Sequence, residues 1–335
     1  MRYSPIFLLT AAVLCFAAAP SRKPEDLPDT VDRVRAAVVK VEVVVRPVIS
    51  REGQFPKFVH IEDLPQNIRG CFSNGSFVCI AGTGFFVNDN AELVTALHVV
   101  DNPVDNEPGT KQILDQLRAA GLEAGLKIGV SLPNVENGAV VLSSLTTQFD
   151  ASVVAEDPKH DLALLRLAQN PFKIPRKAVG GDVNLMLKVL VVKLAANRSR
   201  DGESVISCGF PYGQAGMETS SGVISSAWES NPLNRASLAG YPEAQEVYHV
   251  DLGLNPGNSG GPVFRVFDRA VIGVADARIS AGKDRPLGVV IPSTTVIGFL
   301  KAQGSKWTPS DQKVSLIQKI ELGTNLGTKP VPDCS

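Results

Sequence analysis

A succession of short, valine-rich segments separated by turn residues constrains the fold of this chain most strongly. Valines fill most positions of the stretch Val38 to Val45, and β-branched side chains favour the pleated backbone of a strand. Many such segments with few helical patterns predict an antiparallel sandwich or barrel. The predicted strands are 36–45, 82–87, 93–96, 127–132, 140–145, 149–155, 162–167, 187–194, 204–209, 217–227, 246–251, 262–267, 271–279 and 287–291.

These strands form two clusters on either side of a stretch rich in Pro and Lys. The sequence therefore predicts an all-β protein of two six-stranded antiparallel β-barrels, with a short helical insertion at 110–122 and a C-terminal helix that begins near Ser293. We interpret the insertion as a packing element rather than an active-site lid. The expected order is a signal peptide (1–19), an N-terminal segment (20–35), the first barrel (36–170), a linker (171–180), the second barrel (181–303) and a tail (304–335).

The N-terminus has the pattern of a secretory signal. Arg2 precedes an apolar run from Ile6 to Ala19, and polar residues follow. The run is too short to span a bilayer as a helix, and nothing polar interrupts it, which argues against an N-terminal helix of the fold. We expect export to a bacterial periplasm or to the outside of a cell, with no membrane span after signal removal.

Charge and metal-ligand patterns exclude several classes of partner. The net charge is −1, and no stripe of Lys and Arg marks a surface for nucleic acid or anionic lipid. Histidines and cysteines are scattered without the spacing of metal ligands. We therefore expect no metal and no cofactor.

The cysteines predict one disulfide. Cys71 and Cys79 are equidistant from Gly75, and a three-residue hairpin loop at 74–76 would place them opposite each other, about 4.5–5.5 Å apart. That separation is within disulfide reach in an oxidising compartment. Cys208 lies in an apolar run and is expected to be a buried thiol.

The stretch from Leu254 to Pro262 is the best candidate for chemistry. Ser259 is surrounded by Gly257, Gly260 and Gly261, which leave room for a substrate backbone and for amides that bind an oxyanion. A plain turn is the alternative. The spacing also fits G-x-S-x-G, but a strand rather than a helix follows, and no histidine follows the serine, against the α/β-hydrolase order.

A serine nucleophile needs a base and a carboxylate that orients it. The chain has four histidines, His60, His98, His160 and His249. His98 follows a β-branched strand, which would hold a base rigidly. Carboxylates are too numerous for composition to choose among them.

Motifs in a fixed order give the chain a family resemblance. They are Gly82–Val87, Val94–Val100, His160–Leu167, Gly209–Gly213, Ser221–Ser225, Asp251–Val263 and Leu287–Pro292. Over about residues 30–303 the chain resembles the trypsin-like serine proteases of the HtrA/Deg branch. The resemblance implies that His98 is the base, Asp161 the orienting carboxylate and Ser259 the nucleophile, and that the N–H groups of Gly257 and Ser259 form the oxyanion hole.

The resemblance also implies a substrate class. Proteins or peptides, including unfolded ones, would bind along Gly253, Leu254, Val274 and Ala275. Gly253 occupies the base of the first substrate pocket, where the absence of an acid favours small or medium aliphatic side chains. The alternative is a catalytically silent, protease-like binding or scaffold protein.

The chain departs in three respects from the protease families that it resembles. Asn258 stands where pancreatic-type relatives have an Asp that pairs with a newly cut N-terminus, so we expect no zymogen cleavage of that kind. The insertion that follows His98 is longer than usual. The sequence after residue 305 is too short for a PDZ domain, which leaves the oligomeric state open.

Overall fold

The first sheet forms around β1 (Val38–Ile49), which pairs along both of its edges. Val41 lies opposite Gly82 of β3 (Phe77–Phe86) and opposite Val130 of β5 (Glu123–Glu136). The remaining strands are β4 (Glu92–Ala96), β6 (Ala139–Asp157) and β7 (Leu162–Leu167), in the order β1-β3-β4-β7-β6-β5, and the β1–β5 pairing closes the barrel. The short β2 (Lys57–Phe58) pairs with the outer end of β1.

The second sheet closes in the same way. Its order is β12-β9-β10-β11-β14-β13, and a β12–β13 pairing joins the ends into a six-stranded barrel. All of these pairings are antiparallel, so the predicted fold of two six-stranded antiparallel barrels is confirmed. The strands are β9 (Ser204–Gly209), β10 (Glu218–Ser230), β11 (Glu246–Val250), β12 (Pro262–Arg265), β13 (Val271–Ser280) and β14 (Pro286–Pro292), with β8 (Lys193–Leu194) and β15 (Thr308–Pro309) added in parallel beside β13.

This computed structural model describes a defined part of the chain: residues 27–49, 57–72, 77–101, 108–136, 139–173, 190–230, 246–280 and 286–310. The predicted signal peptide lies outside these residues, as do most of the predicted linker and residues 311–335 of the predicted tail. Within the described ranges, no helix combines the length and the apolar character needed to cross a bilayer.

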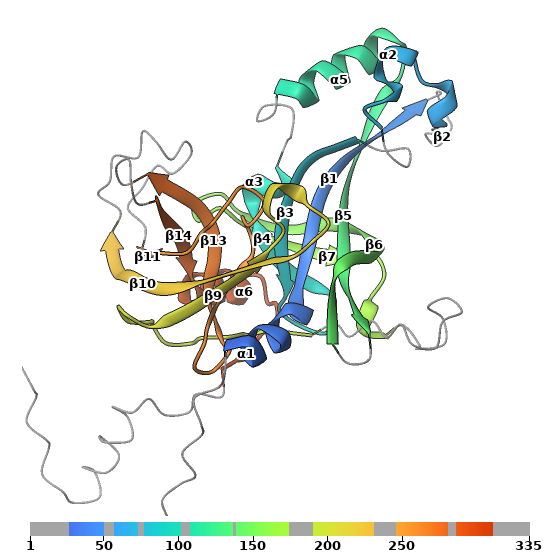
Figure 1. Cartoon of the computed structure of the whole chain (residues 1–335). Coiled ribbons are helices and arrows are strands. Elements are labelled where there is room, and N and C mark those ends of the chain that lie inside the picture. Colours follow the sequence, from blue (N-terminus) through green and yellow to red (C-terminus); the bar gives the residue numbers. More distant parts are fainter. Residues whose placement is uncertain are drawn as a thin grey trace, which may run out of the picture.

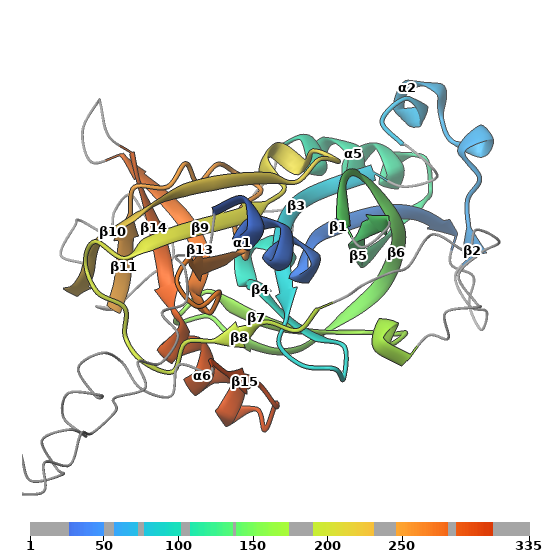
Figure 2. The same ribbon diagram turned by 60° about the horizontal axis from the view of Figure 1, so that its bottom comes forward.

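Besides a buried cluster inside each barrel, one apolar cluster spans the two barrels. Phe85 of the first barrel belongs to the same buried cluster as Phe210 and Phe264 of the second, and Leu300 of α6 (Ser293–Ala302) joins it. Figure 1 shows the barrels side by side, and Figure 2 shows α6 and β15 together at one end of the second. The other helices are α1 (Leu27–Val34), η1 (Arg35–Ala37), η2 (Ile61–Asp63), α2 (Gln66–Arg69), α3 (Leu97–Val100), α5 (Pro108–Ala119), η3 (Pro171–Lys173) and η4 (Pro211–Gly213).

The predicted helical insertion is α5, and it is a packing element. Ile113, Leu114 and Leu117 pack in a buried cluster with Val45 of β1 and Ile68 of α2. The helix therefore covers the extension of β1 and β5 that projects from the first barrel (Figure 1).

The predicted cysteine hairpin is wrong. Cys71 lies in the turn that ends α2, where its N–H bonds to the carbonyl of Ile68 at 2.9 Å, whereas Cys79 lies within β3. Both are thiols in the structure, so the predicted disulfide is not formed. The apolar side chains of Ile68 and Phe72 bind this segment to α5, which competes with strand formation around Cys71. Cys208 is buried, as expected.

Candidate active site

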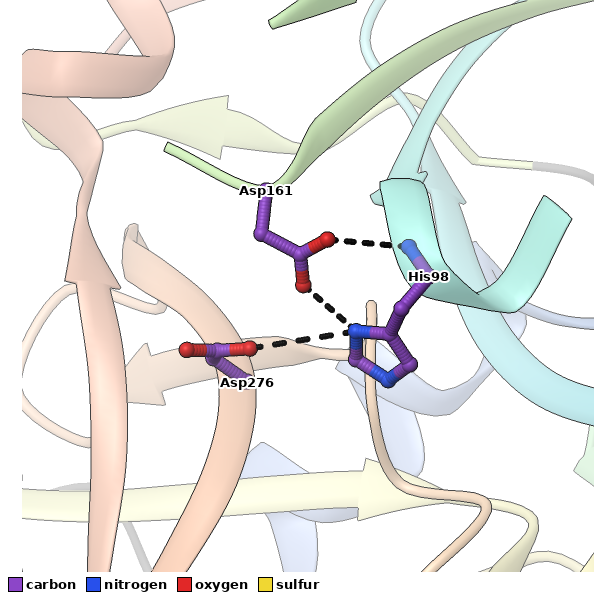
Figure 3. A group of neighbouring side chains, drawn as sticks. All are labelled: His98, Asp161 and Asp276. Carbon is purple, nitrogen blue, oxygen red and sulfur yellow. Dashed lines mark hydrogen bonds and ion pairs between the residues drawn. The ribbon is translucent and has the colours of Figure 1, made fainter. Parts of the chain in front are cut away.

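The first barrel positions His98 next to Asp161. β4 ends at Ala96, and the single turn of α3 that follows carries His98. Asp161 sits in the turn between β6 and β7 with φ of 52°. Its Oδ1 accepts the His98 backbone N–H at 2.9 Å, and its own carbonyl accepts the N–H of Leu97 at 2.9 Å. The imidazole Nδ1 then lies 2.5 Å from Asp161 Oδ2 (Figure 3).

This pairing shifts the ionisation of both groups. Burial acts to lower the pKa of His98, but the hydrogen bond to Asp161 and the negative charges of Asp161 and Asp276 raise it overall. Burial acts to raise the pKa of Asp161, but the hydrogen bonds and charge of His98, with a hydrogen bond from Asp276, lower it overall. The arrangement therefore stabilises an imidazolium beside a carboxylate.

The second barrel presents Ser259 in a turn that rests on the first. The Ser259 carbonyl accepts the N–H of Thr83 at 2.9 Å. Gly260 has φ of 82°, and a Cβ there would lie 2.2 Å from Thr95 Oγ1 and 2.6 Å from the Ala96 nitrogen. Only glycine permits this approach, which brings the serine turn against the strand end that leads to His98.

The Ser259 hydroxyl donates to the backbone carbonyl of Asp276 at 2.9 Å. Asp276 lies on β13, beside the two bonds that join Ala275 to the Gly260 N–H and the Gly261 carbonyl. The hydroxyl has a single proton, so Ser259 must exchange this acceptor before it can donate to Nε2 of His98.

Two amides near the serine are available to a ligand. In the described part of the chain, no backbone carbonyl accepts the N–H of Gly257 or that of Ser259. Gly257 has φ of 97°, and a Cβ there would lie 2.4 Å from the Phe210 carbonyl oxygen. The Gly257 N–H belongs to the Pro256–Gly257 peptide unit, whose carbonyl accepts the Tyr212 N–H at 2.6 Å, while Thr83 Oγ1 donates to the Gly257 carbonyl on the next unit at 2.7 Å.

The predicted substrate-binding residues separate into two groups. Gly253 is exposed and its carbonyl accepts the Ser220 hydroxyl at 3.3 Å, with Leu254 buried behind it. Val274 and Ala275, by contrast, are buried in β13, and the backbone of Ala275 is bonded to the serine turn. Their predicted contact with substrate does not fit this placement, because the core and the turn occupy their side chains and backbone.

Asp276 is the residue that the sequence reasoning missed. Its side chain is buried, and its Oδ1 lies 3.9 Å from His98 Nδ1 (Figure 3). The signal was present in the sequence: a carboxylate follows the otherwise apolar run Val271–Ala275, and a buried charge requires a polar partner.

The side chains of His98, Asp161 and Asp276 also offer possible metal-ligand atoms within 4.8 Å of one another. A tetrahedral ion with ligand bonds of about 2.0–2.1 Å would hold its ligands about 3.3 Å apart. The 2.5 Å separation of Nδ1 and Oδ2 is that of a hydrogen bond instead. The arrangement therefore fits a shared proton rather than a metal ion.

The comparisons with known proteins identify the family of this chain. Residues 82–274 match the family model of the trypsin-like peptidase domain. A probable periplasmic serine endoprotease DegP-like of Rickettsia conorii is 29% identical over 67% of this chain. Serine protease HTRA1B of Danio rerio is 25% identical over 73% of it.

A further DegP-like relative, from Brucella suis, is 31% identical over 48% of this chain. These alignments cover 34%, 38% and 27% of the Rickettsia, Danio and Brucella proteins, so the chain spans about a third of the length of these curated relatives. The crystal structure of the Rv3671c protease in its inactive form aligns with 82% of this chain and 93% of its own, at 19% identity and a TM-score of 0.48. With the family model matched from Gly82 to Val274, this chain belongs to the trypsin-like peptidases, in their HtrA/Deg branch.

Proposed function

We propose that this protein is a serine endopeptidase in which Ser259 is the nucleophile, His98 the general base and Asp161 the carboxylate that orients the base. The observation that carries the proposal is the 2.5 Å Asp161–His98 pair of the first barrel. Beside this pair is the Ser259 turn of the second barrel. That turn packs against Ala96, which precedes His98 by two residues.

The chemistry begins with the serine hydroxyl. Ser259 Oγ leaves the Asp276 carbonyl and transfers its proton to Nε2 of His98 as it attacks the carbonyl carbon of a peptide bond. The imidazolium then gives that proton to the leaving amine, and an acyl-serine ester remains. A water molecule, deprotonated by His98, attacks the ester, and the proton returns to Ser259 as the acid product leaves.

Asp161 keeps the base in the required form. Its Oδ2 accepts the Nδ1 proton, which leaves Nε2 of the neutral ring free to take a proton. Its charge then stabilises the imidazolium that forms during attack, in agreement with the raised pKa of His98.

The N–H groups of Gly257 and Ser259 are proposed as the oxyanion hole. Amides that lack backbone acceptors in the described residues can donate to the negative oxygen of the tetrahedral intermediate. The Gly257 N–H belongs to the Pro256–Gly257 peptide unit, whose carbonyl accepts the Tyr212 N–H at 2.6 Å, so this amide is held in place before substrate binds.

The pocket at Gly253 is proposed to accept small or medium aliphatic side chains. The nearby carboxylate of Asp251 accepts the Val223 N–H at 2.5 Å, and it is therefore engaged by the protein backbone. An Arg or Lys side chain would meet no counter-charge at Gly253 itself. A peptide library cleaved mainly after Arg or Lys would contradict this assignment.

Export is proposed from the Arg2 to Ala19 pattern and from the relatives. The Rickettsia and Brucella proteins are named periplasmic serine endoproteases, and a periplasmic or secreted enzyme meets unfolded proteins as substrates. The rival function, a protease-like scaffold, would bind such chains without cutting them.

Hydrolysis of an unfolded protein by the purified mature chain tests the proposal. Wild type is expected to produce fragments, and Ser259→Ala to produce none. Ser207→Ala is the matched control, because Ser207 is a buried serine of β9 outside the site. Binding of the substrate by wild type without fragments at any pH would favour the scaffold.

A further inference from the structure

Asp276 lies next to all three members of the proposed triad. Its backbone carbonyl accepts the Ser259 hydroxyl at 2.9 Å, and its Oδ1 lies 3.9 Å from Nδ1 of His98. Its carboxyl group offers an oxygen within 4.8 Å of one from Asp161. Asp161 reaches the imidazole from the first barrel and Asp276 from the second (Figure 3).

Two carboxylates therefore face one imidazole nitrogen. Nδ1 carries a single proton when the ring is the base, and the 2.5 Å distance assigns it to Asp161. At 3.9 Å, Asp276 is beyond hydrogen-bond length and acts on the ring through its charge. Its side chain is only 5% exposed, so solvent screens that charge weakly.

We propose that Asp276 is a positioning residue of this site, whose carboxylate places a second negative charge beside the Asp161–His98 pair and makes His98 a base only at higher pH. The inference rests on the proposed function, because it assumes that neutral His98 activates Ser259. Asp276 is a second carboxylate, in addition to the one that a Ser–His–Asp triad requires.

The two carboxylates cannot ionise independently at this separation. Asp161 accepts two hydrogen bonds from His98, at its backbone N–H and at Nδ1, and so keeps its charge to lower pH. Asp276 is the second carboxylate beside the ring. Once ionised, it stabilises the imidazolium and opposes loss of the ring proton.

Among the described residues, the His and acidic side chains clustered with that of Asp276 come from two other elements. α3 contributes His98, and the turn between β6 and β7 contributes Asp161. His160, the neighbour of Asp161, pairs with Asp157 at 2.6 Å. That second Asp–His pair provides an internal control.

The test is the pH profile of acylation by a fluorophosphonate probe. Asp276→Asn keeps the size of the side chain and removes its charge. It is expected to lower the acidic midpoint by about one pH unit, so the variant reacts up to about tenfold faster than wild type below that midpoint. Asp157→Asn is expected to leave the profile unchanged. An unchanged midpoint in a folded Asp276→Asn protein overturns the inference.

A second measurement covers the possibility that Asp276→Asn fails to fold. In Asp161→Asn, the carboxylate left beside the ring is Asp276, so the His98 ring signal in NMR is expected to retain an inflection at acid pH, below the titration of the ring itself. Loss of that inflection overturns the inference. Because this titration needs no catalysis, it tests Asp276 even if wild type proves unreactive toward the probe, an outcome that would count against the proposed function instead.

Discussion

Ser259 and Asp276 are joined by a 2.9 Å hydrogen bond from the serine hydroxyl to a backbone carbonyl of β13. The carboxyl group of the same Asp276 lies 3.9 Å from the imidazole of His98. Nucleophile and base therefore meet at one residue of the second barrel, and the serine must exchange this acceptor for Nε2 of His98 to react.

Activity is expected to fall as pH decreases through the pKa of His98. Neutral imidazole is the reactive form, and the hydrogen bond to Asp161 and the charges of Asp161 and Asp276 outweigh burial to raise that pKa above its ordinary value of 6.5. The acidic midpoint of kcat/KM should consequently lie above 6.5. A midpoint at or below this value would show that Asp161 and Asp276 do not raise the pKa of His98.

Asp161→Asn is expected to lower kcat by about 10³–10⁴-fold with little change in KM. The amide can donate to Nδ1 and so favour the tautomer whose Nε2 carries the proton, which cannot serve as a base. Steady-state kinetics on one peptide substrate, with the equivalent change at Asp157 as control, measures the effect. Equal losses in the two variants would indicate general destabilisation.

Gly260→Ala is expected to abolish activity and to destabilise the protein. The new Cβ would lie 2.2 Å from Thr95 Oγ1 and 2.3 Å from the Thr83 carbonyl, and φ of 82° is unfavourable for alanine. Gly298→Ala in α6 is the control, because no atom lies within 4 Å of its added Cβ. There the change should stabilise by about 0.5–1 kcal/mol in urea unfolding. Similar stability of the two variants would contradict the close packing at Gly260.

Glu92→Gln is expected to reduce the free energy of unfolding by about 1–3 kcal/mol at neutral pH. Glu92 is buried and accepts hydrogen bonds from Asn88 at 2.7 Å and Ser305 at 2.6 Å, besides its contact with Arg166. Arg166 is half exposed, so the ion pair adds little beyond these bonds.

The Glu92 effect should depend on pH in a defined direction. Burial acts to raise the pKa of Glu92, but Arg166, Ser305 and Asn88 lower it overall from 4.5. A lowered pKa stabilises the fold above pH 4.5, and this contribution is lost as pH falls through the lower, folded-state pKa. Urea unfolding at several pH values measures it. Glu218→Gln is the control, because Glu218 is exposed. A loss of unfolding free energy in Glu92→Gln that stays constant as pH changes would contradict this role of Glu92.

The strands of the barrels were predicted well because β-branched residues dominate β1 and recur in β13. Apolar side chains at helical spacing predicted α5, and the helix-start residues that follow Pro292 predicted α6. The closure of the first barrel needs the β1–β5 pairing and that of the second needs the β9–β12 pairing, contacts between distant segments that local patterns do not specify.

The cysteine hairpin failed because symmetry around Gly75 carries no information on tertiary packing. Ile68 and Phe72 bury against α5, and this long-range contact fixes Cys71 in a turn. Family resemblance supplied His98, Asp161 and Ser259, but it could not supply Asp276. The geometry reveals that its carboxyl group lies 3.9 Å from Nδ1 of the imidazole.

The most direct measurement is labelling of the mature protein with a fluorophosphonate probe, followed by mass spectrometry of the labelled peptide. The account predicts a single adduct on Ser259, loss of labelling in Ser259→Ala and His98→Ala, and full labelling in Ser207→Ala. Folded wild-type protein that remains unlabelled across the pH range, or an adduct on another serine, would contradict the assignment of Ser259 as a nucleophile activated by His98.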